Sequence, residues 1–318
     1  MKKHIFLQLL LPVTVLLILS LLELVCGTAN VNWHDPLEDP VLELRAVRVL
    51  ASLAVGAALA MAGMCFQAVL RNVLAEPFTL GISGGASVGA ALAVILNLQV
   101  LSALAMPAMA LLGALILLGI VIFMAGNRSS ESLLLSGVIA GTAASSVLMY
   151  LVSTANRDEL AGLTWWMLGD LQSVDIFMLE VTAGTVIISA IILQYFAREL
   201  NAIAMGDENA WSMGVDPRFF RKFFIVTGSL LAAETVALSG IIAFAGLIVP
   251  HLVRGFYGSD HRKIVLLMML WGGNFILFCD LLARVVNPQQ ELPIGVLTAL
   301  VGGAVFIYLL NRRRGKTL

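Results

Sequence analysis

Long apolar stretches, separated by short polar connections, run through most of the chain. A run of about 18 or more apolar residues is long enough to cross the hydrocarbon core of a bilayer as a helix. The pattern predicts spans at about 5–26, 46–70, 78–98, 104–126, 133–155 and 174–197, and near the end of the chain at about 264–287 and 294–311. We therefore expect an all-α, polytopic membrane protein.

The stretch 223–253 decides the number of spans. It has 31 residues with one charge, Glu234, and a break near Ser239 and Gly240, so it fits either one tilted span or two. Cytoplasmic loops of membrane proteins collect Lys and Arg. Two spans, at about 219–239 and 241–256, place fifteen of the 19 Lys and Arg residues in the cytoplasm, whereas one span places nine there. The charge distribution predicts ten transmembrane helices with both termini cytoplasmic.

Residues 198–217 form a polar segment between two long apolar regions. The segment carries five charges, each costing about 2–3.5 kcal/mol at the centre of a membrane helix, so we place it in the cytoplasm. Gly206 separates two pieces that are compatible with short helices, Asp207 is placed to cap the second, and Gly214 can end it. These signals fit a docking platform for another protein, and they also fit a well-capped connector.

The whole chain is predicted to be a single transmembrane domain, 1–318, with a first half at 1–197, a loop at 198–217 and a second half at 218–318. The sequence 71–81 is similar to 284–295, and each segment joins one span to the next. The predicted topology puts these two segments on opposite sides of the membrane. This indicates inverted repeats, which transporters commonly use to alternate access.

Composition agrees with a membrane protein, and the chain offers no motif of an enzyme: no nucleotide, metal-binding or Ser/His/Asp hydrolase motif occurs in it. Hydrophobic residues make up 60% of the chain, charged residues make up 12%, and the mean hydropathy is +0.97, against about 25% charged residues in average proteins. The three cysteines and four histidines lack metal-ligand spacing, so we expect no metal site. Residues 315–317, Gly-Lys-Thr, lack the glycine that a phosphate loop needs at position 310. Uphill transport would draw its energy from a partner or from ion coupling.

Small residues at helical spacing occur in the third and fifth predicted spans. They are Gly81, Gly85 and Gly89 in the third span, and Gly137, Gly141, Thr142 and Ser145 in the fifth. Small residues let helix backbones approach closely. These positions are expected either to pack helices together or to line a translocation path.

Charged residues inside membrane spans are candidates for function. Asp280 and Arg284 are four residues apart and can pair on one helix face near the external end of the ninth span. Glu234 has no partner nearby in the sequence, so it is either a proton or cation site or a hydrogen-bonded, neutral carboxyl. An ion-coupled secondary transporter that uses Glu234 or Asp280 is therefore an alternative hypothesis.

A set of motifs in a fixed order carries a family resemblance. The motifs are Arg45-Ala-Val-Arg48, Gly56 to Gly63, Gln67, Arg71-Asn72, Leu74 to Pro77, Leu80 to Ser83, Gly162 to Gly169, Gly246 to His251, Asp260 to Arg262, Asp280 to Arg284 and Glu291 to Gly295. With them, the region from about 43 to 311 resembles the FecCD family, the permeases of binding-protein-dependent ABC importers for iron-siderophores, haem and cobalamin. The chain departs from the family at Val47, where proline is usual, at Gly240 to Phe244, and at Glu234.

The resemblance implies a permease subunit in the bacterial plasma (inner) membrane that imports an iron(III)-siderophore or related metal chelate. Its implied partners are a second permease copy or paralogue, an extracytoplasmic substrate-binding protein, and two ATPases that bind ATP and Mg, so the chain itself needs no cofactor. Homodimer and heterodimer both remain open.

The resemblance also implies roles for particular residues. Arg45, Arg48 and Arg284 match external arginines that face acidic residues of the binding protein. The ATPase contact is expected within Asn201 to Gly214. Its candidate residues are Asn201, Gly206, Asp207, Glu208, Trp211, Ser212 and Gly214.

Overall fold

The computed structural model of the chain describes residues 2–27, 39–126, 130–172, 174–286 and 291–314. In these residues it contains thirteen α-helices and two short 3-10 helices. In chain order they are α1 (Lys2–Val25), α2 (Pro40–Leu70), η1 (Pro77–Leu80), α3 (Ile82–Ile95), η2 (Leu98–Val100), α4 (Ala105–Ala125), α5 (Ser130–Thr154), α6 (Arg157–Met167), α7 (Ile176–Tyr195), α8 (Ala197–Ala204), α9 (Asp207–Ser212), α10 (Pro217–Ser239), α11 (Ala245–Tyr257), α12 (His261–Val286) and α13 (Ile294–Arg314). The expected all-helical fold is confirmed.

A helix lies at each of the ten predicted spans: α1 to α5, α7 and α10 to α13. Within the described part of the chain, seven helices are long and apolar enough to cross a membrane, namely α1, α2, α4, α5, α7, α10 and α12. Shorter apolar helices lie at 82–95 and 294–307. The helix lengths and compositions agree with the expected polytopic membrane protein.

The stretch 223–253 is divided between two helices. α10 ends at Ser239, and Gly240 follows it with φ +70°, a conformation that favours glycine. A Cβ atom at Gly240 would also lie only 2.0 Å from the carbonyl oxygen of Trp166. The predicted break near Ser239 and Gly240 is confirmed, since α11 starts only at Ala245.

Helix α6 was not predicted, because the sequence between 155 and 174 reads as a polar connection. Its start carries a reciprocal capping box: the Glu159 backbone N–H donates to Asn156 Oδ1 (3.0 Å), and the Asn156 backbone N–H donates to Glu159 Oε2 (2.9 Å). The Asn-x-x-Glu spacing was the available signal. Only Leu163 of this helix is fully buried, which explains why hydropathy missed it.

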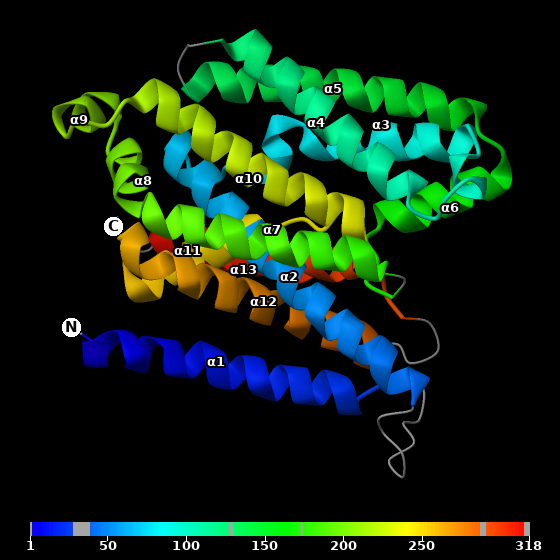
Figure 1. The fold of residues 1–318 in the computed structure, drawn as a ribbon, viewed down its shortest axis with the longest axis horizontal. Helices are drawn as coiled ribbons and strands as arrows, with labels where there is room; N and C mark the ends of the chain where they lie inside the picture. Colours follow the sequence, from blue (N-terminus) through cyan, green and yellow to red (C-terminus); the bar gives the residue numbers. More distant parts are fainter. Residues whose placement is uncertain (1, 28–38, 127–129, 173, 287–290, 315–318) are drawn as a thin grey trace.

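The helices are arranged in three groups (Figure 1). α3, α4 and α5 lie along one edge, α1 lies along the opposite edge, and α2, α10, α11 and α12 lie between them. α8 and α9 lie at the end of the molecule where α1 begins, whereas α6 lies at the other end. We call these the α9 end and the α6 end.

Helix α2 is the centre of the core. In its apolar window 89% of the residues are buried, and the helix contacts α7, α10, α11 and α12. Two of its glycines lie directly against other backbones: a Cβ at Gly56 would be 2.1 Å from the carbonyl oxygen of Gly272, and one at Gly63 would be 1.8 Å from that of Gly246. Such distances leave no room for any side chain, so glycine sets how closely these helices pack.

Replacing Gly63 with alanine is therefore expected to destabilise the protein by about 1–3 kcal/mol, the usual cost of overpacking a core. The matched control is Gly184→Ala in α7, where a Cβ would meet nothing within 4 Å and alanine favours the helix. Thermal unfolding in detergent should show a lower midpoint for Gly63→Ala and an unchanged or higher midpoint for Gly184→Ala. Equal midpoints would contradict the close approach of α2 and α11.

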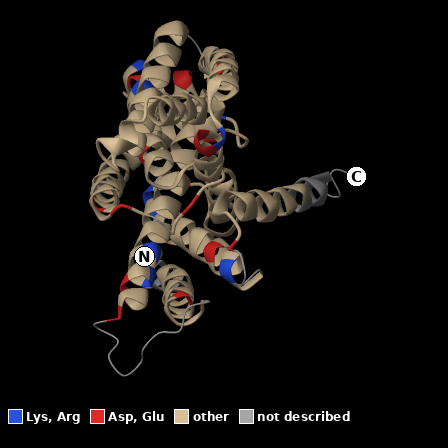
Figure 2. Ribbon diagram, turned by 90° about the vertical axis from the view of Figure 1, so that its right-hand side faces the viewer, with Lys and Arg blue, Asp and Glu red and all other residues tan. Residues whose placement is uncertain are grey.

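Two helices lie at the periphery. Only 17% of the apolar window of α1 is buried, and the Asn274 side chain of α12 donates a hydrogen bond to the carbonyl oxygen of Pro12 in α1 (2.9 Å). α13 projects away from the rest of the molecule (Figure 2), and of the helices it contacts mainly α11 and α12. These two helices are therefore attached to the core rather than enclosed by it.

Candidate functional site

The polar segment 198–217 contains the two short helices expected from its sequence, α8 and α9. Gly206 joins them with φ +109°, and Gly214 follows α9 with φ +77°. Asp216 caps α10, because its carboxylate accepts the backbone N–H of Arg218 (2.9 Å). We call residues 197–214 the coupling segment.

The side chain of Asn201 connects α8 to the start of α12 through hydrogen bonds. Its Nδ2 donates to Asp260 Oδ1 (2.8 Å), while its Oδ1 accepts the backbone N–H of His261 (3.0 Å) and lies 2.6 Å from His261 Nδ1. Arg262 also binds Asp260, and its hydrogen bonds are the largest cause that holds the pKa of this carboxyl below its ordinary range. The carboxylate therefore stays ionised at physiological pH, where it accepts from both Asn201 and Arg262.

Asp207 connects α9 to α10 through an ion pair. Its carboxylate binds the guanidinium of Arg221, which is 8% exposed, and lies 3.9 Å from Arg71 Nη2 at the end of α2. The expectation that Asp207 caps α9 is wrong: the cap position is Gly206, without a side-chain hydrogen bond, and Asp207 is the first helical residue. The ion pair with Arg221 occupies the carboxylate instead.

The remaining candidates in the coupling segment face outward. Glu208, Ser212 and Gly214 are exposed, and the Trp211 side chain is 56% exposed. Tryptophan, when presented by a firmly held helix, is a common anchor in protein interfaces. The coupling segment thus combines buried attachments to the protein with an exposed outer face.

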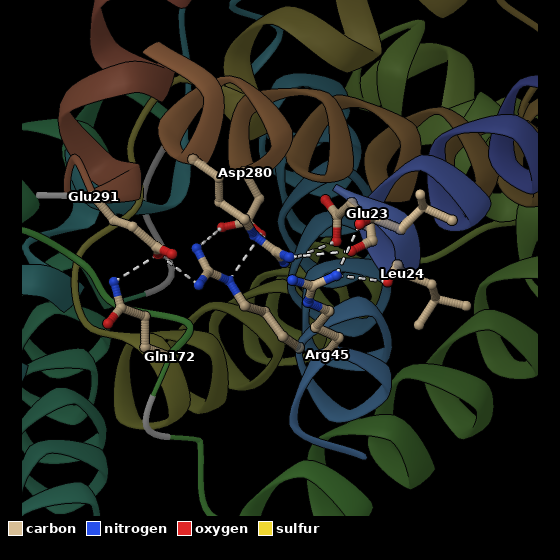
Figure 3. A network of polar contacts seen from close by, with 9 residues as sticks. Glu23, Leu24, Arg45, Gln172, Asp280 and Glu291 are labelled. Carbon is tan, nitrogen blue, oxygen red and sulfur yellow. Dashed lines mark hydrogen bonds and ion pairs between the residues drawn. The ribbon is translucent and has the colours of Figure 1, made fainter. Parts of the chain in front are cut away.

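Figure 3 shows a network of charged side chains. It lies toward the α6 end, since Arg48, Asp280 and Glu291 line a cavity together with residues of α6. Arg48 of α2 donates to both carboxylate oxygens of Asp280 in α12 (2.8 and 2.7 Å) and to Glu291 Oε2 (2.7 Å). Glu291 also accepts from Gln172 Nε2 (2.8 Å). The network therefore ties α2 and α12 to the loops that precede α7 and α13.

Arg284 extends the network to α1. Its Nη2 lies 2.7 Å from Asp280 Oδ2 and 3.3 Å from Glu23 Oε2. The predicted pair between Asp280 and Arg284 is present in the structure. Glu23 and Arg48 were not predicted as their partners, although Glu23 is itself a charge within an apolar span, which was the available signal.

The three arginines that were expected to dock a binding protein all bond within the chain. Arg45 donates to the carbonyl oxygens of Leu24 (2.8 Å) and Val25 (3.0 Å), while Arg48 and Arg284 belong to the charged network. Arg45 is 7% exposed and Arg284 is 4% exposed. Their docking role stays a prediction, and a docking carboxylate would have to compete with these internal partners.

The glycines of the third and fifth spans lie at helix contacts. A Cβ at Gly85 would be 2.4 Å from the carbonyl oxygen of Gly113, and one at Gly89 would be 1.9 Å from that of Met109 in α4. At Gly81 a Cβ would be 3.1 Å from the Cα of Gly141 in α5, and at Gly137 it would be 2.8 Å from the Cα of Leu80. The geometry supports close packing at all five glycines.

Thr142 and Ser145 lie on an exposed face of α5, and their hydroxyls donate to carbonyl oxygens of their own helix (2.8 and 3.0 Å). Their role in a translocation path stays a prediction. Glu234 is 7% exposed and accepts a hydrogen bond from Thr185 of α7 (3.1 Å). The structure thus supplies a partner for Glu234 that the local sequence did not show.

Residues 15–312 match the model of the FecCD transport family. The chain belongs to the FecCD transport family. Among curated members, it is 37% identical to a vitamin B12 import permease, BtuC, of Klebsiella pneumoniae, covering 95% of this chain and 93% of the relative. It is 33% identical to the Fe(3+) dicitrate permease FecD of Escherichia coli (93% and 95%) and 34% identical to the uncharacterized permease YvrB of Bacillus subtilis (91% and 84%).

The fold of this FecCD member is also similar to a solved structure described as an inward-facing, putative metal-chelate type ABC transporter. The TM-score is 0.87 at 27% identity, and the match covers 98% of this chain and all of that one. The protein is accordingly the permease subunit of an ABC importer and is not itself an ATPase. Membership in this class implies ATPase and binding-protein partners.

Proposed function

We propose that this permease imports an iron(III)-siderophore or a related metal chelate across the bacterial plasma membrane. Its relatives are named for vitamin B12 and for ferric dicitrate, and the similar solved structure is described as a metal-chelate type. All three point to a bulky metal complex as cargo. In this proposal ten helices cross the membrane, and the α9 end, with both termini, lies in the cytoplasm, as the distribution of Lys and Arg favours.

The proposed assembly contains two permease chains and two ATPases. A second copy of this chain, or a related permease, would pack against α13, which projects from the body (Figure 2). Each ATPase would dock on one coupling segment. The extracytoplasmic binding protein would dock at the α6 end, where Arg45, Arg48 and Arg284 lie.

The main support for this proposal is the way in which the coupling segment is bonded to the core helices. Asn201 and Asp207 bind α12 and α10, so a displacement of α8 and α9 passes directly to helices of the core. ATP binding would draw the two ATPases together, and the coupling segments would convert that movement into a switch from an outward-facing to an inward-facing path.

Replacing Trp211 with alanine is expected to weaken assembly with the ATPase at least tenfold, because it removes an exposed aromatic anchor. The matched control is Trp165→Ala: Trp165 is 52% exposed and belongs to α6, at the opposite end of the molecule. Affinity would be measured with purified permease and its cognate ATPase, and thermal unfolding would check that both variants fold. Unchanged affinity for Trp211→Ala would refute the docking role of α9.

A transport assay distinguishes an ATP-driven importer from an ion-coupled secondary transporter. Vesicles that contain the permease, the ATPase and the binding protein should accumulate a ferric siderophore only when ATP is supplied. Uptake that persists without any ATPase, and that collapses with the proton gradient, would instead support a secondary transporter using Glu234 or Asp280.

A further inference from the structure

A cavity of about 970 Å³ lies beside the coupling segment at the α9 end. Its walls come from the end of α2, from α8, and from the turn between α11 and α12. Four arginines line it, Arg71, Arg198, Arg254 and Arg262, and Asp260 is its one acidic lining residue among those described. Four positive charges and one negative charge give the lining a formal charge of +3, so the cavity favours an anionic occupant.

Three of these arginines retain donors that are free to bind an occupant. Arg262 is already paired with Asp260 (2.7 Å). Arg254 contacts Gln67 Oε1, and the nearest carboxylate oxygen to Arg71 is 3.9 Å away. No hydrogen bond or ion pair within the described parts of the chain engages the Arg198 side chain, which is exposed.

His261 is a buried polar side chain beside these arginines. It lines the cavity and is 4% exposed, and its Nε2 has no hydrogen-bond partner among the described residues. Asn201 Oδ1 accepts from the backbone N–H of His261, and its neighbour Nδ2 donates to Asp260. This orientation makes Oδ1 an acceptor for Nδ1–H as well (2.6 Å), which leaves Nε2 of the neutral ring as an acceptor.

The cavity therefore favours an anionic occupant, and a carboxylate can accept from the free arginine donors. A polypeptide segment with an acidic side chain supplies such a carboxylate. A phospholipid phosphodiester is anionic too, so the test below separates a lipid headgroup from a polypeptide. The chain's own C-terminal segment, 312–318, contains three arginines and a lysine, so a positively charged cavity would repel it.

The position of the cavity identifies which polypeptide would enter it. One wall is the coupling segment itself, through Asn201, Met205 and Met213. Met205 is 61% exposed and Met213 is 57% exposed, and methionine adapts its shape to a partner. The cavity is thus continuous with the surface on which the ATPase is proposed to dock.

We propose that an acidic segment of the docked ATPase inserts into this basic cavity and binds Arg198, Arg254 and Arg71. This inference rests on the proposed function. It adds a second contact beside the outer face of α9, and this contact reaches α2 and α11 directly. Charge pairs of this kind set the register of a complex and its association rate, and salt weakens them.

The test compares Arg198→Glu with Arg218→Glu, using the ATPase that assembles with the wild-type permease. Arg198 makes no described side-chain bond, so the reversal removes no internal partner. Arg218 is exposed at the start of α10 and lies outside the cavity, so it controls for the overall change in charge. We expect Arg198→Glu to weaken ATPase binding at least tenfold at low salt, and Arg218→Glu to change it less than twofold.

A covalent probe provides a second measurement that does not depend on the arginines. Ser259 is exposed and lines the cavity. A photo-crosslinker on the Ser259→Cys variant should capture an acidic peptide of the ATPase, identified by mass spectrometry. The native Cys65 and Cys279 are buried, and the wild-type chain controls for labelling of Cys26.

Several outcomes would overturn the proposal, and they are distinguishable. If Arg198→Glu binds the ATPase as tightly as the wild type while Trp211→Ala does not, the cavity proposal fails and the proposed function stands. If the effect of Arg198→Glu appears in cardiolipin nanodiscs and vanishes in phosphatidylcholine nanodiscs, the occupant is a lipid headgroup. If the wild-type permease binds no ATPase, both proposals fail.

Discussion

Replacing Asp280 with asparagine is expected to destabilise the protein by about 3–5 kcal/mol, the cost of removing one partner from a buried ion pair. Asp280 is 0% exposed, and its carboxylate binds the guanidinium groups of both Arg48 and Arg284. An amide keeps the shape of the side chain but leaves two buried positive charges with less compensation. Unfolding in detergent, followed by circular dichroism, would measure the loss.

The control for this variant is Asp175→Asn. Asp175 is exposed and caps α7 by accepting the backbone N–H of Met178 (3.0 Å). Asparagine caps helices about as well as aspartate, so the same chemical change should cost little there. If the two variants were equally stable, the buried network would contribute nothing to stability.

Replacing Asn201 with leucine is expected to lower the amount of cargo transported per ATP hydrolysed at least tenfold. The change removes all three contacts of the amide with the Asp260–His261 turn. Each buried polar group left without a partner costs about 1–3 kcal/mol. α8 would then move without α12, so ATP hydrolysis would continue while transport falls.

The measurement is the ratio of transport to ATP hydrolysis in vesicles. Gln194→Ala is the control, because it removes a single hydrogen bond from α7 to the start of α12, to the carbonyl oxygen of Arg262 (3.0 Å). That bond is exposed, and its loss should leave the ratio nearly unchanged. A normal ratio in Asn201→Leu would show that the Asn201 contacts do not transmit the movement.

Local patterns in the sequence predicted local features correctly. The apolar runs located ten helices, and Ser239-Gly240 marked a real break because glycine alone fits its backbone there. The pair of short helices at 198–217 followed from the glycine signals at Gly206 and Gly214. Asp280 and Arg284 could be paired because a helix brings residues four apart onto one face.

Contacts between distant segments could not be predicted in the same way. Arg48 and Asp280 are 232 residues apart, and no spacing rule relates them. The same holds for Asn201, whose partners begin 59 residues later. Hydropathy indicates that a charge within a membrane span is energetically unfavourable. It does not show which other helix supplies the compensating charge. The docking role of Arg45, Arg48 and Arg284 came from their match to external arginines of the family, and the sequence did not show the internal partners that they have in the structure.

The attachment of α1 has a consequence for biogenesis. Glu23 finds its compensating charge in Arg284, 261 residues later in the chain. At about 5–20 residues per second, a ribosome needs on the order of ten to fifty seconds to synthesise that interval. During this time the first helix holds a carboxyl group that lacks its final partner. We therefore expect the first helix to keep this carboxyl near the headgroups, or in its protonated form, until the ninth apolar segment is synthesised.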